Sequence, residues 1–175
     1  VGRALFGLSP VTGGRILLGG EPIAVTSPRQ AIARGINLVC ADRVAESVVP
    51  GLSIRENLFL NPLASGRGPW SYLKPTTEAR AAHELGEQVG LRPNDCSAPI
   101  EWLSGGNQQK VVVGRWLHLC GRVYVFEDPT AGVDVGAKAD IYKLFDVALG
   151  RGATILIVST DFEEVAKVCH RALVF

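Results

Sequence analysis

The sequence predicts an α/β fold with a mixed, largely parallel sheet, and two observations lead to this class. Short apolar runs alternate with helical segments through short turns, as in parallel strand–helix–strand units. Residues 14–25 instead form two short strand-like runs around Gly19 and Gly20, which predicts an antiparallel hairpin. Residues 61–75 are rich in proline and glycine and predict a loop.

The first half of the chain carries two helix-start signals. Ser27 and Pro28 predict the N-cap and the first position of a short helix that ends at Gly35. Ser53 and Glu56 have the spacing of a capping box, in which each side chain accepts a hydrogen bond from the other residue's backbone N–H group.

The remaining elements are assigned from apolar periodicity and from the positions of glycine and proline. They are a buried strand at 36–40, helices at 76–89 and 104–119, a strand at 123–126, a helix at 136–149, a strand at 154–158, a helix from Asp161 and a final strand at 171–175.

The composition indicates a folded protein of ordinary charge. Its 175 residues fit one domain with a substantial core. Lysine plus arginine number 18 and aspartate plus glutamate 17, so the net charge of +1 offers no basic excess for a nucleic-acid partner. The four cysteines lie far apart without metal-ligand spacing, which favours reduced, buried thiols. No apolar run reaches the roughly 18 residues of a membrane helix, so action at a membrane would need a partner.

Residues 103–110 place Ser104, Gly105 and Gly106 at the start of a predicted helix. Two glycines leave backbone N–H groups unshielded where the helix dipole is positive, which is a favourable seat for a phosphate. The alternative is that Ser104 simply caps the helix. Capping would account for the serine but not for two glycines, each of which costs about 1 kcal/mol relative to alanine.

Two acidic clusters follow. The strand at 123–126 leads into Glu127 and Asp128, and acids beyond the carboxyl end of a strand commonly hold Mg²⁺ and position an attacking water. The alternative is that both acids cap the next helix or face solvent. Residues 131–138 form a small-residue turn entering a helix, and Asp134, their only acid, could equally be a plain helix cap.

The order and spacing of these clusters resemble the ABC ATPases. Residues 103–110 (Leu-Ser-Gly-Gly-Asn-Gln-Gln-Lys) are similar to the signature motif, 123–130 to the Walker B segment and 131–138 to the D-loop. The Asn-Gln-Gln-Lys ending and the Gly-Val-Asp-Val-Gly-Ala-Lys run are similar to the second ATPase domain of ribose- and galactose-type monosaccharide importers. The segments 3–7, 27–29, 41–43 and 52–57 match that subgroup in the same order.

The resemblance implies a P-loop-type ABC ATPase core with an antiparallel β-hairpin portion and a helical subdomain. The chain would be one partial domain. Residues 1–41 would hold the end of the core and the antiparallel part, 42–103 the helical subdomain, and 104–175 the signature helix with the rest of the core.

The same resemblance implies the site residues. Those that contact the nucleotide would be Ser104, Gly105, Gly106, Gln108 and Asp134. The catalytic residues would be Glu127 near Mg²⁺, Asp128 near the attacking water and Thr160 at the switch position.

The resemblance also implies a setting for the domain. ATP and Mg²⁺ would be the cofactors, and ATP hydrolysis would power import of a monosaccharide. The partners would be a second ATPase domain in the same or another chain, membrane permease subunits and, indirectly, a periplasmic or extracellular sugar-binding protein, with no nucleic acid. The domain would lie peripherally on the cytoplasmic face of the cell membrane.

Three departures from the family pattern leave a second hypothesis open. The phosphate loop G-x-x-x-x-G-K-[ST] does not occur in these 175 residues, and Val1 would fall just after it. Both ends are interpreted as truncations, because the chain begins at Val1 without any methionine and residues 171–175 resemble a strand that stops without a turn. Glu127-Asp128 stands where the family has Asp-Glu, and Ala41 stands where Gln or Glu is usual.

The second hypothesis is a poorly hydrolysing half-site that binds nucleotide and completes the partner domain's ATP site. On that hypothesis, exchanging the two acids should raise turnover, since a misplacement of about 1 Å can cost about 100-fold in rate. An ABC ATPase acting on DNA or ribosomes is less favoured, because the segment between Ala41 and Leu103 shows no sustained heptads.

Overall fold

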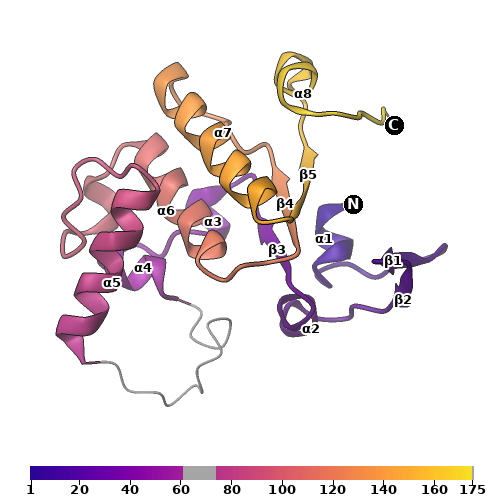
Figure 1. Ribbon diagram of the computed structural model, residues 1–175, viewed down its shortest axis with the longest axis horizontal. Helices are drawn as coiled ribbons and strands as arrows, with labels where there is room; N and C mark the ends of the chain where they lie inside the picture. Colours follow the sequence, from indigo (N-terminus) through magenta and orange to yellow (C-terminus); the bar gives the residue numbers. More distant parts are fainter. Residues whose placement is uncertain (61–73, 175) are drawn as a thin grey trace.

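The computed structural model describes residues 1–60 and 74–174, and at its centre lies a three-stranded parallel sheet (Figure 1). The strands are β3 (Ile36–Val39), β4 (Val123–Glu127) and β5 (Thr154–Val158), with β4 in the middle. All of β3 and the centre of β4 are buried, which explains their continuous apolar sequences. The α/β class predicted from the sequence is confirmed.

Parallel pairing brings the carboxyl ends of the strands to one edge of the sheet. The register sets Val39 opposite Phe126, and Glu127 opposite Val158. The loops that follow the three strands therefore begin next to one another, at the edge where open α/β sheets bind ligands.

Two long helices cover one face of this sheet. α6 (Gly105–Leu117) packs on β3, α7 (Val135–Gly150) packs on β5, and the two helices pack on each other. α1 (Gly2–Leu5) contacts β3 and β4 from the other side (Figure 1). Within the described ranges, no helix combines the length and the apolar character needed to cross a bilayer.

Two further helices, α4 (Ile54–Leu58) and α5 (Pro75–Gln88), lie on the side of α6 away from β5 (Figure 1). The short helix α3 (Arg43–Glu46) follows β3, and the 3₁₀ helix η2 (Ile100–Trp102) precedes α6 along the chain. The capping box at the start of α4 is confirmed, because Ser53 Oγ accepts from the Glu56 N–H while the Glu56 carboxylate accepts from the Ser53 N–H. Most of the predicted loop at 61–75 lies outside the described residues, and the boundaries of the helical subdomain stay a prediction.

The predicted hairpin is confirmed. β1 (Ile16–Leu18) and β2 (Glu21–Ile23) pair in antiparallel fashion around Gly19 and Gly20. These glycines have φ values of +64° and +88°, as a two-residue turn of the primed type requires.

The helices α2 (Pro28–Ala33) and α8 (Phe162–Val168) begin at the predicted caps, Ser27 and Asp161. The predicted strand at 171–175 is wrong for the part that is described. After α8 the chain leads away from the sheet (Figure 1), and Leu173 and Val174 are 68% and 79% exposed. A strand needs a neighbouring backbone to receive its hydrogen bonds, and apolar composition alone does not supply one.

Candidate functional site

The signature-like segment lies at the N-terminus of α6, where Ser104 holds the N-cap position. The Ser104 hydroxyl makes no capping bond to the helix backbone, so the plain capping alternative is wrong. Its Oγ instead accepts a hydrogen bond from Asn107 Nδ2 at 3.0 Å. Because a hydroxyl has one donor and two acceptor lone pairs, this contact leaves the Ser104 O–H able to donate to a ligand.

Both glycines after Ser104 have a packing reason. A β-carbon at Gly106 would lie 2.5 Å from Ala137 Cβ at the start of α7, closer than carbon atoms approach. A β-carbon at Gly105 would collide with the guanidinium of Arg43. Close packing thus gives Gly106, and to a smaller extent Gly105, a reason that does not depend on phosphate binding, and contact of this turn with a phosphate stays a prediction.

Arg43 received no role from the sequence, yet it joins α6 to the segment that resembles a D-loop. Its Nη1 donates to Ala131 O at 3.1 Å, across 88 positions of the chain, while Nη2 covers Gly105. Its Nε is buried and has no hydrogen-bond partner within the described residues. A basic residue after an acid in the loop following β3 was the available signal, but spacing could not show what it reaches.

Asp134 and Gln108 both have structural partners. Asp134 Oδ1 accepts from the Ala137 N–H at 3.0 Å, so this exposed acid caps α7 as its alternative reading proposed. The Gln108 amide donates to Leu103 O at 3.2 Å and is turned toward η2. Contact of either side chain with a nucleotide stays a prediction.

Glu127 ends β4 beside α1 and is only partly buried. A β-carbon at Gly2 would lie 2.6 Å from Glu127 Oε1 and 2.9 Å from Val125 Cγ1, so glycine in α1 permits this close approach. Glu46, which forms an ion pair with Arg3, and to a smaller extent Glu127 raise the pKa of the Arg3 guanidinium.

The Glu127 carboxylate fits one ligand of a Mg²⁺ ion. It accepts no hydrogen bond within the described residues, which leaves its oxygens open. Mg²⁺ is usually held by one or two carboxylates and completes its shell with water and phosphate oxygens. No group of three or more Asp, Glu, His or Cys side chains in the described ranges could hold a metal ion, so Glu127 would act with the ligand's own oxygens.

Asp128 and Thr160 come together at the ends of neighbouring strands. Asp128 Oδ1 accepts from the Thr160 backbone N–H at 3.0 Å and from its hydroxyl at 3.4 Å. Asp128 has a φ of +42°, a left-handed conformation that aspartate and asparagine adopt more readily than other side chains. Such strained backbone persists where the surroundings hold it in place, often at functional sites.

Glu164 was also missed by the sequence analysis. It lies in α8 and is 4% exposed, and its carboxylate accepts hydrogen bonds from side chains on three other segments. The local signal was an acid on the inward side of a helix capped by Asp161, but its partners are remote in sequence.

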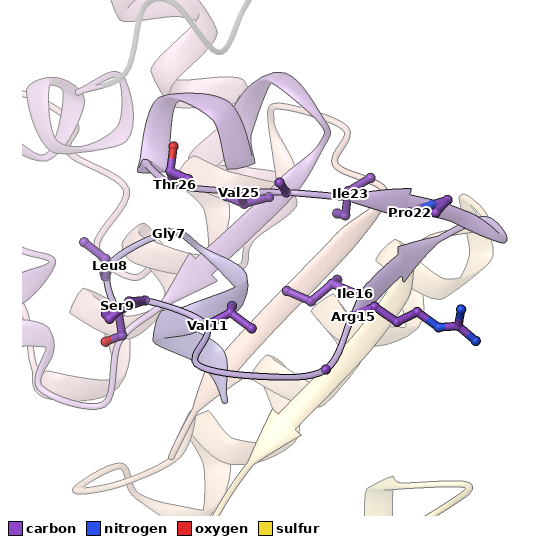
Figure 2. Close-up of a pocket in the computed structure, with 13 residues that line it drawn as sticks. Gly7, Leu8, Ser9, Val11, Arg15, Ile16, Pro22, Ile23, Val25 and Thr26 are labelled. Atoms are coloured by element: carbon purple, nitrogen blue, oxygen red, sulfur yellow. The ribbon is translucent and has the colours of Figure 1, made fainter.

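Ala41 is exposed beyond β3 and its methyl group offers no ligand. A pocket of about 670 Å³ lies between the hairpin and the loop after α1, where Leu8, Val11, Ile16 and Val25 are among its lining residues (Figure 2). This pocket contains none of the predicted site residues.

The predicted residues thus fall into two groups. The signature turn comprises Ser104, Gly105 and Gly106, with Asp134 beside them. The strand-end site comprises Glu127, Asp128 and Thr160. Within the described residues no hydrogen bond joins the two groups directly, and the loop at 129–133 connects them along the chain.

Known proteins are similar to this sequence over nearly its whole length. The ribose import ATP-binding protein RbsA of Hahella chejuensis is 40% identical over 172 residues, which cover 98% of this chain and 34% of that protein. The ribose import ATP-binding protein RbsA 3 of Rhizobium meliloti is 40% identical over 173 residues, 99% of this chain and 34% of that protein. The chain therefore spans about a third of the length of the curated relatives it matches.

Solved structures show the same fold at lower identity. A nucleotide-free ATP-binding cassette from an ABC transporter gives a TM-score of 0.75 at 21% identity, covering 95% of this chain and 67% of that chain. The dimeric cassette MJ0796, in a post-hydrolysis state bound to ADP and Pi, gives 0.72 at 19% identity, covering 93% and 69%. The family model described as ABC transporter matches residues 1–131. The order of the motifs, the parallel sheet and this match lead to one conclusion: the chain belongs to the ABC transporter family, as an ATP-binding domain.

Proposed function

We propose that this chain is the part of an ATP-binding subunit that helps hydrolyse ATP to power import of a monosaccharide. The observation that carries the proposal is the bond between Asp128 and the Thr160 N–H, which joins the ends of β4 and β5 beside Glu127. The names of the relatives, which specify ribose import, support the substrate class.

Asp128 orients the attacking water in this proposal. Thr160 holds one oxygen of its carboxylate, Oδ1, and no described residue donates to the other, so Oδ2 is left for water. Glu127, whose carboxylate is open, would hold Mg²⁺, and the ion would neutralise charge on the phosphates. Ser104 donates its hydroxyl to a phosphate oxygen, with the Arg43 guanidinium nearby as a positive charge.

The partners follow from the family. We infer a second ATPase domain, which supplies the phosphate loop opposite Ser104, and permease subunits that carry the sugar across the membrane. A sugar-binding protein outside the cell would deliver the substrate to the permease. The domain then works at the cytoplasmic face of the membrane. The poorly hydrolysing half-site receives no support from the comparisons, and we do not propose it.

The test uses the intact transporter in proteoliposomes, with ribose and galactose as the trial sugars. Asp128→Asn keeps the size of the side chain but removes the charge that would orient the water, so it should reduce ATPase turnover by about 100-fold or more. Ser104→Arg, which puts a bulky cation where a phosphate must fit, should abolish ATP-driven uptake while the fold stays intact by circular dichroism. Normal uptake by both variants would overturn the proposal.

A further inference from the structure

Glu164 is a buried carboxylate that the proposed mechanism does not use. Its Oε1 accepts from Thr130 Oγ1 at 2.8 Å and from the Tyr142 hydroxyl at 3.1 Å, and its Oε2 accepts from Ser159 Oγ at 2.8 Å. Thr130, like Glu164, is almost fully buried. Burial of a carboxylate is costly unless hydrogen bonds replace its water, and three hydroxyl donors do so here.

The three donors come from three different segments. Thr130 lies two residues after Asp128, in the loop that leaves β4, and Ser159 lies directly before Thr160, in the loop that leaves β5. Tyr142 lies on α7, about two turns beyond that helix's N-terminus. Burial, and then the Glu164 charge, raise the pKa of the Tyr142 phenol, so this group stays protonated and donates.

Two of these contacts therefore hold the segments that carry Asp128 and Thr160. The bond between those two residues spans the gap between β4 and β5 at 3.0 Å, and Asp128 keeps a left-handed backbone there. A strained residue needs surroundings that fix it, and a clamp on both adjacent loops supplies such surroundings. The Tyr142 contact instead fastens the carboxylate to a helix that carries no strand-end residue.

We propose that Glu164 is a positioning residue, which clamps the loops after β4 and β5 so that Asp128 and Thr160 stay in register. The inference rests on the proposed function insofar as it assigns the consequence to ATP turnover. It differs from a stability role in one respect: the Thr130 and Ser159 contacts matter for the rate, and the Tyr142 contact does not.

The experiment removes one donor at a time in the intact transporter. Thr130→Val and Ser159→Ala should each lower kcat for ATP by roughly tenfold, with KM changed less than about twofold, because loop misplacement acts on the transition state. Tyr142→Phe is the matched control, since it deletes a donor to the same carboxylate. It should lower the melting temperature about as much as Thr130→Val and Ser159→Ala do, while its kcat stays within twofold of the wild-type value. Glu164→Gln keeps one acceptor oxygen, so its kcat should lie between that of the wild type and that of Glu164→Ala.

A second measurement separates this inference from the proposed function. Hydrogen exchange of the Thr160 amide reports its bond to Asp128 whether or not the protein turns over ATP. Ser159→Ala should speed this exchange at least tenfold, and Tyr142→Phe should leave it unchanged. A wild-type transporter without ATPase activity would refute the proposed function alone. Unchanged Thr160 exchange in Ser159→Ala, or an equal fall of kcat in all three donor variants, would overturn the positioning role.

Discussion

The signature turn and the strand-end site are built by different physical means. The signature turn depends on close approach, because Gly106 sits against Ala137 where no side chain fits. The strand-end site depends on hydrogen bonds between side chains and loops, as between Asp128 and Thr160. The signature turn should therefore be sensitive to added side-chain volume, and the strand-end site to changes in the position or chemistry of its polar atoms.

Exchange of Glu127 and Asp128 tests this difference most directly. The half-site hypothesis drawn from the sequence predicts that ATP turnover rises on exchange, whereas the contacts of Asp128 predict that it falls. The double variant Glu127→Asp with Asp128→Glu lengthens the side chain that Thr160 holds, and so moves its carboxylate past the Thr160 N–H. Glutamate also tolerates a φ of +42° less well than aspartate does. We expect kcat for ATP to fall by about tenfold or more, as misplacement of a catalytic group predicts.

The measurement is steady-state ATPase activity, with the partner ATPase site disabled so that only this site reports. Glu127→Asp alone is the control, because it leaves the Asp128 contact untouched and should cost less than the double variant. A rise in turnover on exchange would instead favour the half-site hypothesis.

Added volume at the signature turn should reduce stability. Gly106→Val places branched carbons against Ala137 on a packed helix, and overpacking of this kind costs about 1–3 kcal/mol in the free energy of unfolding. Gly150→Ala on α7 is the control, because a β-carbon there meets open space. The control should be neutral or stabilise by up to about 1 kcal/mol, since alanine favours helix over glycine. The measurement is urea unfolding of both variants. A Gly106→Val variant as stable as the wild type would contradict the prediction.

Local signals in the sequence predicted the helices, strands and turns, whereas contacts between residues far apart in the sequence became visible only in the structure. The capping box of Ser53 and the turn at Gly19 and Gly20 depend on residues within four positions of one another, so a sequence pattern records them. The Arg43 bond to Ala131 spans 88 positions and leaves no local pattern.

The candidate site shows the same limit. The sequence located the acids at the end of β4 because strand ends follow from apolar runs. It could not show that Thr160 would hold Asp128, nor that Glu164 would lie behind both loops, because these contacts depend on how β4 and β5 pair. The final strand was predicted wrongly for a related reason, since its apolar residues have no strand to pair with in the described chain.

Added side-chain volume should affect Arg43 only at position 105, because the Arg43 guanidinium covers Gly105. Gly105→Ala collides with the end of a flexible side chain, which can move, so we expect a loss of less than about 1 kcal/mol. Arg43→Ala removes the obstacle together with the bond to Ala131, at a cost of about 1 kcal/mol for a hydrogen bond. A double-mutant cycle by urea unfolding should show that Gly105→Ala costs less when Arg43 is absent. Strict additivity would show that the two residues do not press on each other.

Another small effect concerns the ion pair that joins α6 to α7. Lys110 Nζ lies 2.7 Å from Asp140 Oδ2, with Lys110 buried and Asp140 partly exposed. Lys110, followed by Lys143, lowers the pKa of the Asp140 carboxyl through hydrogen bonds. Because the unfolded chain binds this proton more readily, the contribution is present above the ordinary aspartate pKa of about 3.9 and is lost as the pH falls through the lower folded value.

Asp140→Asn should therefore destabilise the protein at neutral pH by about 1 kcal/mol, the upper range for a partly exposed pair. The difference from the wild type should shrink as the pH falls below about 4, where the unfolded carboxyl takes up its proton. Asp146→Asn is the matched control, since Asp146 is exposed on the same helix and forms no ion pair within the described residues. Urea unfolding of the three proteins between neutral and acid pH measures this. A destabilisation by Asp140→Asn that persists unchanged in acid would show that shape, rather than charge, holds α6 to α7 at this point.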